Sequence, residues 1–181
     1  MAILTADGVL FPDNTELTAG FRIIAVRFAY DATAITSSVQ RSAQFLNCEV
    51  TMPPTDSNNS RYLIMGESNI DDTNQNTCGA DLELWVGVTP SGGGTETTHW
   101  VSRPGTHSHY WGGNTNDKYW QLKNFHIDDG ATTTTISQGQ TRRYRAYGNN
   151  HNNNVNFGAG TNTDAGPRHK LIVIEFDGGL I

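Results

Sequence analysis

From residue 21 onward the sequence is divided into short runs of strand type, and this pattern limits the fold more than any other feature. Within 81–88 the apolar residues Leu82, Leu84, Val86 and Val88 occupy alternate positions, as expected for a strand that buries one face. Similar runs separated by polar turns occur at 21–30, 44–52, 61–65, 95–102, 118–127, 132–137, 141–147 and 169–176. Their number and spacing predict an all-β fold, a β-sandwich of jelly-roll type.

The composition favours the same fold class. Asn, Thr, Ser and Gly make up 68 of the 181 residues, and only 17% of the residues are charged. Small polar side chains compete with the backbone hydrogen bonds of helices, whereas Thr suits a pleated surface. We therefore expect short strands and polar turns within one main domain.

The first 20 residues differ from the rest of the chain. Gly8, Pro12 and Gly20 interrupt the segment, and the apolar run 9–11 is too short to build a core. We predict that residues 1–20 form an extended N-terminal arm packed on a neighbouring chain, and that residues 21–181 form the sandwich.

One strand is apolar on both faces. Residues 171–174 read Leu-Ile-Val-Ile, without the alternation seen at 81–88. This pattern indicates either a central strand or a strand whose outer face is covered by a neighbouring subunit.

Charge and hydropathy exclude two classes of partner. The formal net charge is −6 and the basic residues are scattered, which argues against binding to nucleic acid. No apolar run approaches ~20 residues, so we expect no membrane insertion. The N-terminus resembles no secretory signal, and we expect synthesis in a cytosol.

The two cysteines match no metal-binding spacing. Cys48 lies within a strand-type run and is expected to be a small buried apolar residue, whereas Cys78 lies in a polar loop. A disulfide between them is not expected in a reducing compartment, although the sequence leaves their redox state open.

His107 and His109 form the sharpest short motif. On an extended segment both imidazoles lie on the same side, which gives two metal ligands per chain. Three chains around an axis would supply six nitrogens, a set that iron or another transition metal accepts. The simpler interpretation is that both histidines hydrogen-bond locally or face water, with no cofactor.

Aromatic residues are concentrated in the same part of the chain. Tyr110 and Trp111 lie in the glycine-bounded loop 104–117, where exposed rings could stack on a sugar. Trp100 and Trp120 lie on strand-type runs, and we expect them in the core.

A second polar loop, 148–167, surrounds His151 with asparagines, and Val155 and Phe157 could anchor it. Long loops of this kind are commonly functional. His151 therefore joins Tyr110 and Trp111 as a binding candidate.

No pattern indicates catalysis. The adjacent acids at 71–72 and 128–129 would point to opposite faces of an extended chain, so turn formation explains them better than a glycosidase pair. Motifs for nucleophilic or phosphate chemistry are absent, and we do not expect an enzyme.

Arg143 and Arg145 share a strand face, where they could pair with acids of another subunit or face solvent.

Two segments resemble proteins of tailed bacteriophages. Residues 8–15, Gly-Val-Leu-Phe-Pro-Asp-Asn-Thr, are similar to a pattern in fibre and collar proteins, with Asn14 where Gly is usual. Residues 105–109, Gly-Thr-His-Ser-His, look like segments of fibre tips whose histidines bind iron on a threefold axis. The resemblance implies a virion protein, and the polar β-rich remainder is similar in character to phage adhesion and decoration proteins.

The sequence is compatible with three functions. The first is a virion structural protein, a homotrimeric tail-fibre or adhesion-type subunit that contacts other virion proteins through residues 1–20, with a host surface glycan as a candidate ligand. A capsid decoration or head-fibre protein is its closest alternative. The second is a monomeric carbohydrate-binding module, and the third is a hydrolase, which the sequence supports least.

Overall fold

The computed structural model describes residues 22–38, 43–72, 79–102, 119–131, 133–152, 155–158 and 168–178, together with three short strands nearer the N-terminus. Within these residues every regular element is a β-strand. No described segment forms a helix of the length and hydropathy that crossing a membrane requires. The prediction of an all-β fold is confirmed.

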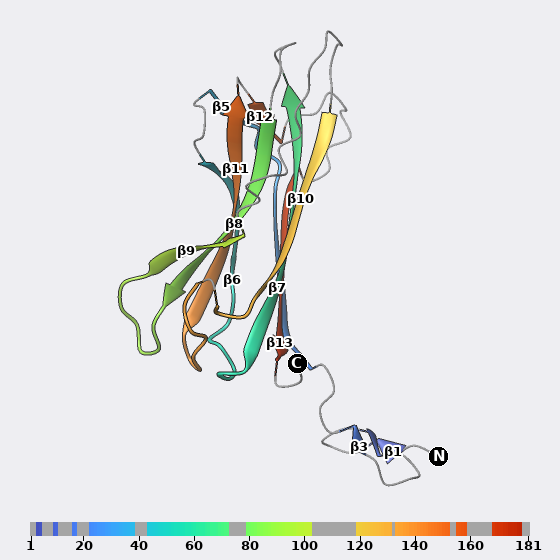
Figure 1. Ribbon diagram of the computed structural model, residues 1–181, viewed down its shortest axis with the longest axis vertical. Helices are drawn as coiled ribbons and strands as arrows, with labels where there is room; N and C mark the ends of the chain where they lie inside the picture. The colour runs from blue at the N-terminus through green and yellow to red at the C-terminus, as the bar shows by residue number, and fades with distance from the viewer. Residues whose placement is uncertain are drawn as a thin grey trace.

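The strands form two antiparallel sheets that lie face to face as a sandwich (Figure 1). The first sheet contains, side by side, β4 (Ile23–Asp31), β13 (His169–Asp177), β7 (Ser60–Asp72) and β10 (Tyr119–Asp128). At the C-terminal end of β7 this sheet is extended by β12 (Val155–Phe157), which pairs with β7, and by β5 (Ile35–Ser37), which pairs with β12. The second sheet has the order β6 (Ala43–Thr51), β11 (Thr141–Asn152), β8 (Gly79–Thr89) and β9 (Thr97–Ser102).

The core lies between the sheets and follows the alternation of the sequence. Leu82, Leu84, Val86 and Val88 of β8 are all at most 5% exposed. Other inward-facing residues complete one continuous cluster, including Leu46, Cys48, Val50, Ile64, Leu171 and Val173. Burial of these side chains is the main driving force for the fold.

The N-terminal segment contains a small sheet of its own. Strands β1 (Ile3–Leu4), β2 (Val9–Leu10) and β3 (Glu16–Leu17) pair in that order and antiparallel. Figure 1 shows these strands near the end of the sandwich at which β13 ends. The backbone of this segment therefore reverses direction twice, and its role as an arm that contacts other chains remains a proposal.

Several strands extend further than the sequence predicts. Residues 71–72 continue β7, where Asp71 pairs with β10 and both residues pair with β12, so the prediction of a turn there is wrong. Strand β11 continues to Asn152, and β12 follows within the segment predicted to be a long loop. Conversely, residues 133–137 form no strand, although the sequence predicts one.

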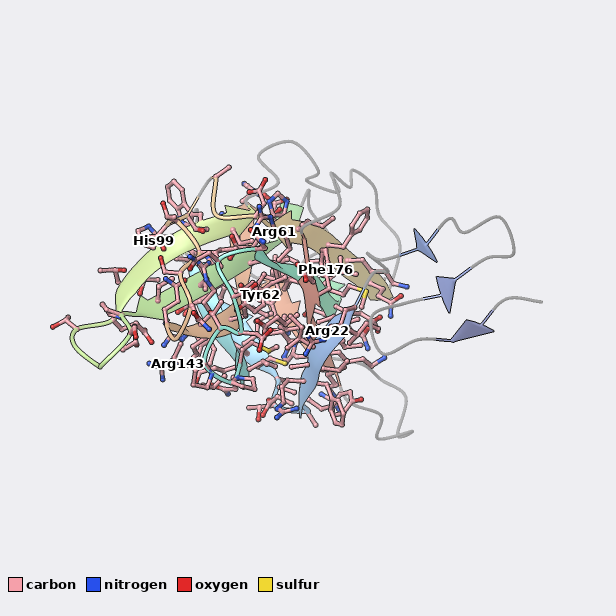
Figure 2. The ribbon with its side chains drawn as sticks, turned by 90° about the horizontal axis from the view of Figure 1, so that it is seen from below. Arg22, Arg61, Tyr62, His99, Arg143 and Phe176 are labelled. Atoms are coloured by element: carbon pink, nitrogen blue, oxygen red, sulfur yellow. The ribbon has the colours of Figure 1, made fainter. Side chains whose placement is uncertain are left out.

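One buried ion pair interrupts the apolar core. The Arg142 guanidinium donates to Asp128 Oδ2 at 2.5 Å, and both side chains have no exposed surface. Arg142 also donates to Gln140 Oε1 at 2.8 Å and to the Thr134 carbonyl at 2.7 Å. Its guanidinium carbon lies 5.7 Å from the ring centre of Tyr62, which Figure 2 shows between the sheets. The 133–137 segment is thus held by side-chain contacts to Arg142.

Asp128 accepts three further hydrogen bonds. The Tyr144 hydroxyl donates to its Oδ2 at 2.9 Å, while the Thr133 hydroxyl and the Gly130 amide donate to its Oδ1 at 2.9 and 3.0 Å. Asp129 accepts from the Ala131 amide at 2.9 Å. The predicted turn at 128–129 is confirmed, and Asp128 also has a role in the core that its position beside Asp129 does not reveal.

Cys48 is a free, buried thiol, as predicted. Burial, with a contribution from Asp31, raises the pKa of the Cys48 thiol to about 12. At pH 8 only about one thiol in 10⁴ would then be ionised, and the thiolate is the reactive form. In a Cys78→Ala variant we expect no labelling of the folded protein by a thiol reagent at pH 8, and one label per chain in denaturant. Rapid labelling before unfolding would contradict this burial.

Candidate functional site

The outer face of the first sheet carries two rows of apolar side chains. Directly paired residues of neighbouring strands lie on the same face of a sheet. The pairing places Phe28, Ile172, Met65 and Phe125 in one row. The next row contains Val26, Ile174, Leu63 and Ile127. We refer to these eight residues, with Tyr30 beside them, as the apolar face.

The ends of both rows are strongly exposed. Phe125 is 76% exposed, Phe28 62% and Tyr30 52%, with Ile127 and Val26 at 46% and 43%. An aromatic residue presents about 150–250 Å², so the three rings alone expose roughly 300 Å². Together with the aliphatic residues they form a patch within the range of the largest patch on a typical monomer, about 300–600 Å². Patches of this size are often functional.

The apolar face also contains a hollow. A cavity of about 280 Å³ is lined by Met65, Phe125 and Ile172, with Lys123 and Lys170 at its border. Protruding rings and a hollow therefore lie on the same face.

A polar border limits the apolar face on one side. Glu67 accepts from Lys170 at 2.9 Å and from Gln121 at 2.5 Å, and it lies 4.0 Å from Lys123. An apolar centre with a polar rim is the usual arrangement of a protein interface.

The doubly apolar run at 171–174 is explained by this arrangement. β13 is a central strand between β4 and β7, and its inward residues Leu171 and Val173 are fully buried. Its outward residues Ile172 and Ile174 are half-buried in the apolar face. The first predicted alternative, a central strand, is therefore confirmed.

Of the predicted site residues, the structure describes His151. It lies on β11 rather than in a loop, and its Nε2 pairs with Asp81 Oδ2. The His151 side chain is 26% exposed, whereas that of Asp81 is 2% exposed. The other candidates, Tyr110, Trp111, His107 and His109, lie outside the described residues. Among those described, no three His, Cys, Asp or Glu side chains are grouped as a metal site requires.

One prediction about the second sheet is wrong, because Trp100 is not in the core but 49% exposed on β9. Arg143 and Arg145 both pair with Glu49 and Glu96 of their own chain. The Arg143 side chain is 38% exposed, in agreement with the solvent-facing alternative, whereas that of Arg145 is 13% exposed. Burial opposes ionisation of Glu96, but hydrogen bonds from the two arginines outweigh it and lower the pKa of this carboxyl.

No protein-family model matches this chain, and no curated protein matches it. Two similar solved structures are those of the infectious bursal disease virus Gx strain and of the VP2 subviral particle of the same virus. They are 14% and 13% identical to this chain and cover 87% and 97% of it, each with a TM-score of 0.35. This chain spans 38% and 42% of the chains in those structures.

Proposed function

We propose that the chain is a structural subunit of a virion, of the tail-fibre or adhesion type, and that it assembles through its apolar face. The observation that carries this proposal is the exposed apolar surface across the four long strands of the first sheet, β4, β13, β7 and β10, with its polar border. A standard interface buries about 800 Å² per partner, and the three exposed rings of the apolar face alone supply roughly 300 Å² of that area. A subunit that works as one of several identical copies needs such a surface.

The order of the strands supports a virion role by analogy. Numbered along the chain, the eight strands of six or more residues have the order first, eighth, third, sixth in one sheet and second, seventh, fourth, fifth in the other. We infer a jelly roll from this order. Jelly rolls recur in viral capsid and lectin domains, although a fold alone does not define a function.

We further propose a homotrimer in which residues 1–20 contact other virion proteins. The resemblance of residues 8–15 to fibre and collar proteins supports this attachment role. A capsid decoration or head-fibre protein would use the same apolar face for assembly, whereas a carbohydrate-binding module would be a monomer.

The solution mass of the purified chain tests the proposal. We expect a trimer, three times the 19.8 kDa chain, and we expect Phe28→Asp and Phe125→Asp each to shift it to monomer. A central aromatic residue of an interface contributes about 2 kcal/mol or more, and burying an added carboxylate costs more. Thr95→Asp, which adds the same charge to an exposed loop before β9, should leave the trimer intact. A monomeric wild type would contradict assembly and favour the binding module.

A further inference from the structure

A row of four aromatic rings crosses the outer face of the second sheet, on the opposite side of the molecule from the apolar face. Each strand contributes one ring: Phe45 from β6, Tyr147 from β11, Trp85 from β8 and Trp100 from β9. Neighbouring ring centres are separated by 5.5, 5.3 and 5.5 Å. We call these residues the aromatic row.

The outer members of the aromatic row present apolar area to solvent. Trp100 is 49% exposed and Phe45 is 37% exposed. Trp100 meets Trp85 edge to face, with 82° between the ring planes. The contacts within the row hold these rings in place without covering them, so they need no ordering when a ligand stacks on them.

The polar side chains on one side of the row are already oriented. The Trp85 indole donates to Glu83 Oε2 at 3.0 Å, and the Asn149 amide donates to Glu83 Oε1 at 2.9 Å. Glu83 and Asn149 are 1% and 2% exposed. The buried Asn149 Oδ1 has no hydrogen-bond partner among the described residues, and such an atom retains the capacity to accept one.

The polar side chains on the other side form an ion-pair network. Arg145 pairs with Glu49 at 2.6 Å and with Glu96 at 2.8 Å, while Arg143 bonds both acids as well. A network that is preformed binds a ligand without the cost of ordering its side chains.

The charges on this face select among ligands. The two arginines balance Glu49 and Glu96, and Glu83 and Asp81 lie on the same face. The face is therefore acidic overall, and an anionic ligand would be repelled. A neutral ligand with one apolar face and several hydroxyl groups suits ordered rings flanked by polar atoms.

We propose that the aromatic row binds a neutral saccharide, with a pyranose ring stacked on Trp100 and its hydroxyl groups facing the polar side chains beside the row. This inference deepens the attachment role proposed above and rests on it for its biological meaning. The sugar contact proposed here lies on the outer face of the second sheet, whereas the sequence predicts it in the loop 104–117. Cross-strand packing alone would also stabilise the sheet, so the test must separate binding from stability.

Titration calorimetry of the full chain with three neutral probes, maltohexaose, lactose and the tetramer of N-acetylglucosamine, tests the site, with sialyllactose as an anionic probe. We expect at least one neutral probe to bind and sialyllactose not to bind. Trp100→Ala should weaken the neutral probe at least tenfold. Ile23→Ala is the matched control, because Ile23 is similarly exposed, at 54%, but lies on the other sheet and outside the apolar face. The affinity of Ile23→Ala for the neutral probe should equal that of the wild type.

Three results would overturn the proposal: no neutral probe bound up to about 10 mM, binding of sialyllactose alone, or equal affinity in Trp100→Ala and the wild type. Thermal unfolding of each variant shows that a lost affinity is not a lost fold. Solution mass separates this inference from the proposed function. A trimer that binds no saccharide refutes only the saccharide site, whereas a monomer that binds one refutes only the assembly.

Discussion

Replacing Asp128 with asparagine is expected to lower the free energy of unfolding by about 3 to 5 kcal/mol, because the Arg142 guanidinium then stays buried without its counter-charge. Arg142 and Asp128 have no exposed side-chain surface, so water cannot replace the lost carboxylate. The total stability of a domain is about 5–15 kcal/mol. The loss is therefore large enough to leave the variant marginally folded, which urea unfolding followed by circular dichroism would measure.

The geometry of this pair explains why the effect should exceed that of an ordinary ion pair. The Asp128 carboxylate accepts four hydrogen bonds, from the Arg142 guanidinium, the Tyr144 hydroxyl, the Thr133 hydroxyl and the Gly130 amide. Burial is the main cause that raises the pKa of Tyr144 well above its ordinary value, and the nearby Asp128 adds to it. Tyr144 therefore remains a donor to this carboxylate at any pH at which the protein is studied.

The neighbouring acid provides a matched control. Asp129→Asn makes the same chemical change one residue away, where the side chain is exposed and accepts a hydrogen bond from the Ala131 amide. Surface changes of this kind are usually within about 0.5 kcal/mol. Equal losses in Asp128→Asn and Asp129→Asn would show that the buried ion pair does not stabilise the fold as we describe.

The fold class could be predicted because it depends on local patterns. Alternation at 82, 84, 86 and 88 sets which face of β8 is buried, and this follows from strand geometry alone. Most other strand-type runs also coincide with strands to within a few residues. Short polar turns between successive strands favour antiparallel pairing, since parallel strands need long crossover connections.

The polar segments were harder to interpret because their partners are distant in sequence. Residues 148–152 have the composition of a loop, yet they continue β11. The Asn150 amide donates to the Ser37 carbonyl at 2.9 Å, and Asn156 accepts from the Thr36 hydroxyl at 2.6 Å. Side-chain amides thus satisfy backbone and hydroxyl groups of β5, a pairing that no local pattern contains.

The surfaces could be predicted only in part, because register decides which residues meet. The apolar run at 171–174 indicated a strand with two apolar faces, but the contribution of Phe28 and Phe125 depends on pairing across four strands. Trp100 is predicted in the core, but it lies on the outer face. A strand-type run does not by itself tell which face of the sheet an aromatic side chain lies on, and in β9 the Trp100 ring lies outside, beside Trp85.

The second large effect is expected where β11 passes β12. Phe157 is fully buried, and a Cβ atom added at Gly148 would lie 2.5 Å from its ring carbons Cδ1 and Cε1. Phe157→Ala should therefore lower the free energy of unfolding by about 3 to 5 kcal/mol through loss of the ring and the cavity it leaves. Gly148→Val should lower it by about 1 to 3 kcal/mol or more, because the core has no room for the added carbons.

The double variant distinguishes this packing from two independent defects. Once the ring of Phe157 is removed, the valine at position 148 can occupy part of the space, so the two losses should not add. We expect the double variant Gly148→Val/Phe157→Ala to lose less free energy of unfolding than the two single variants lose together, by at least about 1 kcal/mol. Coupling of this size is typical of residues in contact. Strict additivity in urea unfolding would mean that Phe157 does not pack over Gly148. The predicted anchoring of the asparagine-rich segment by Phe157 would then need another explanation.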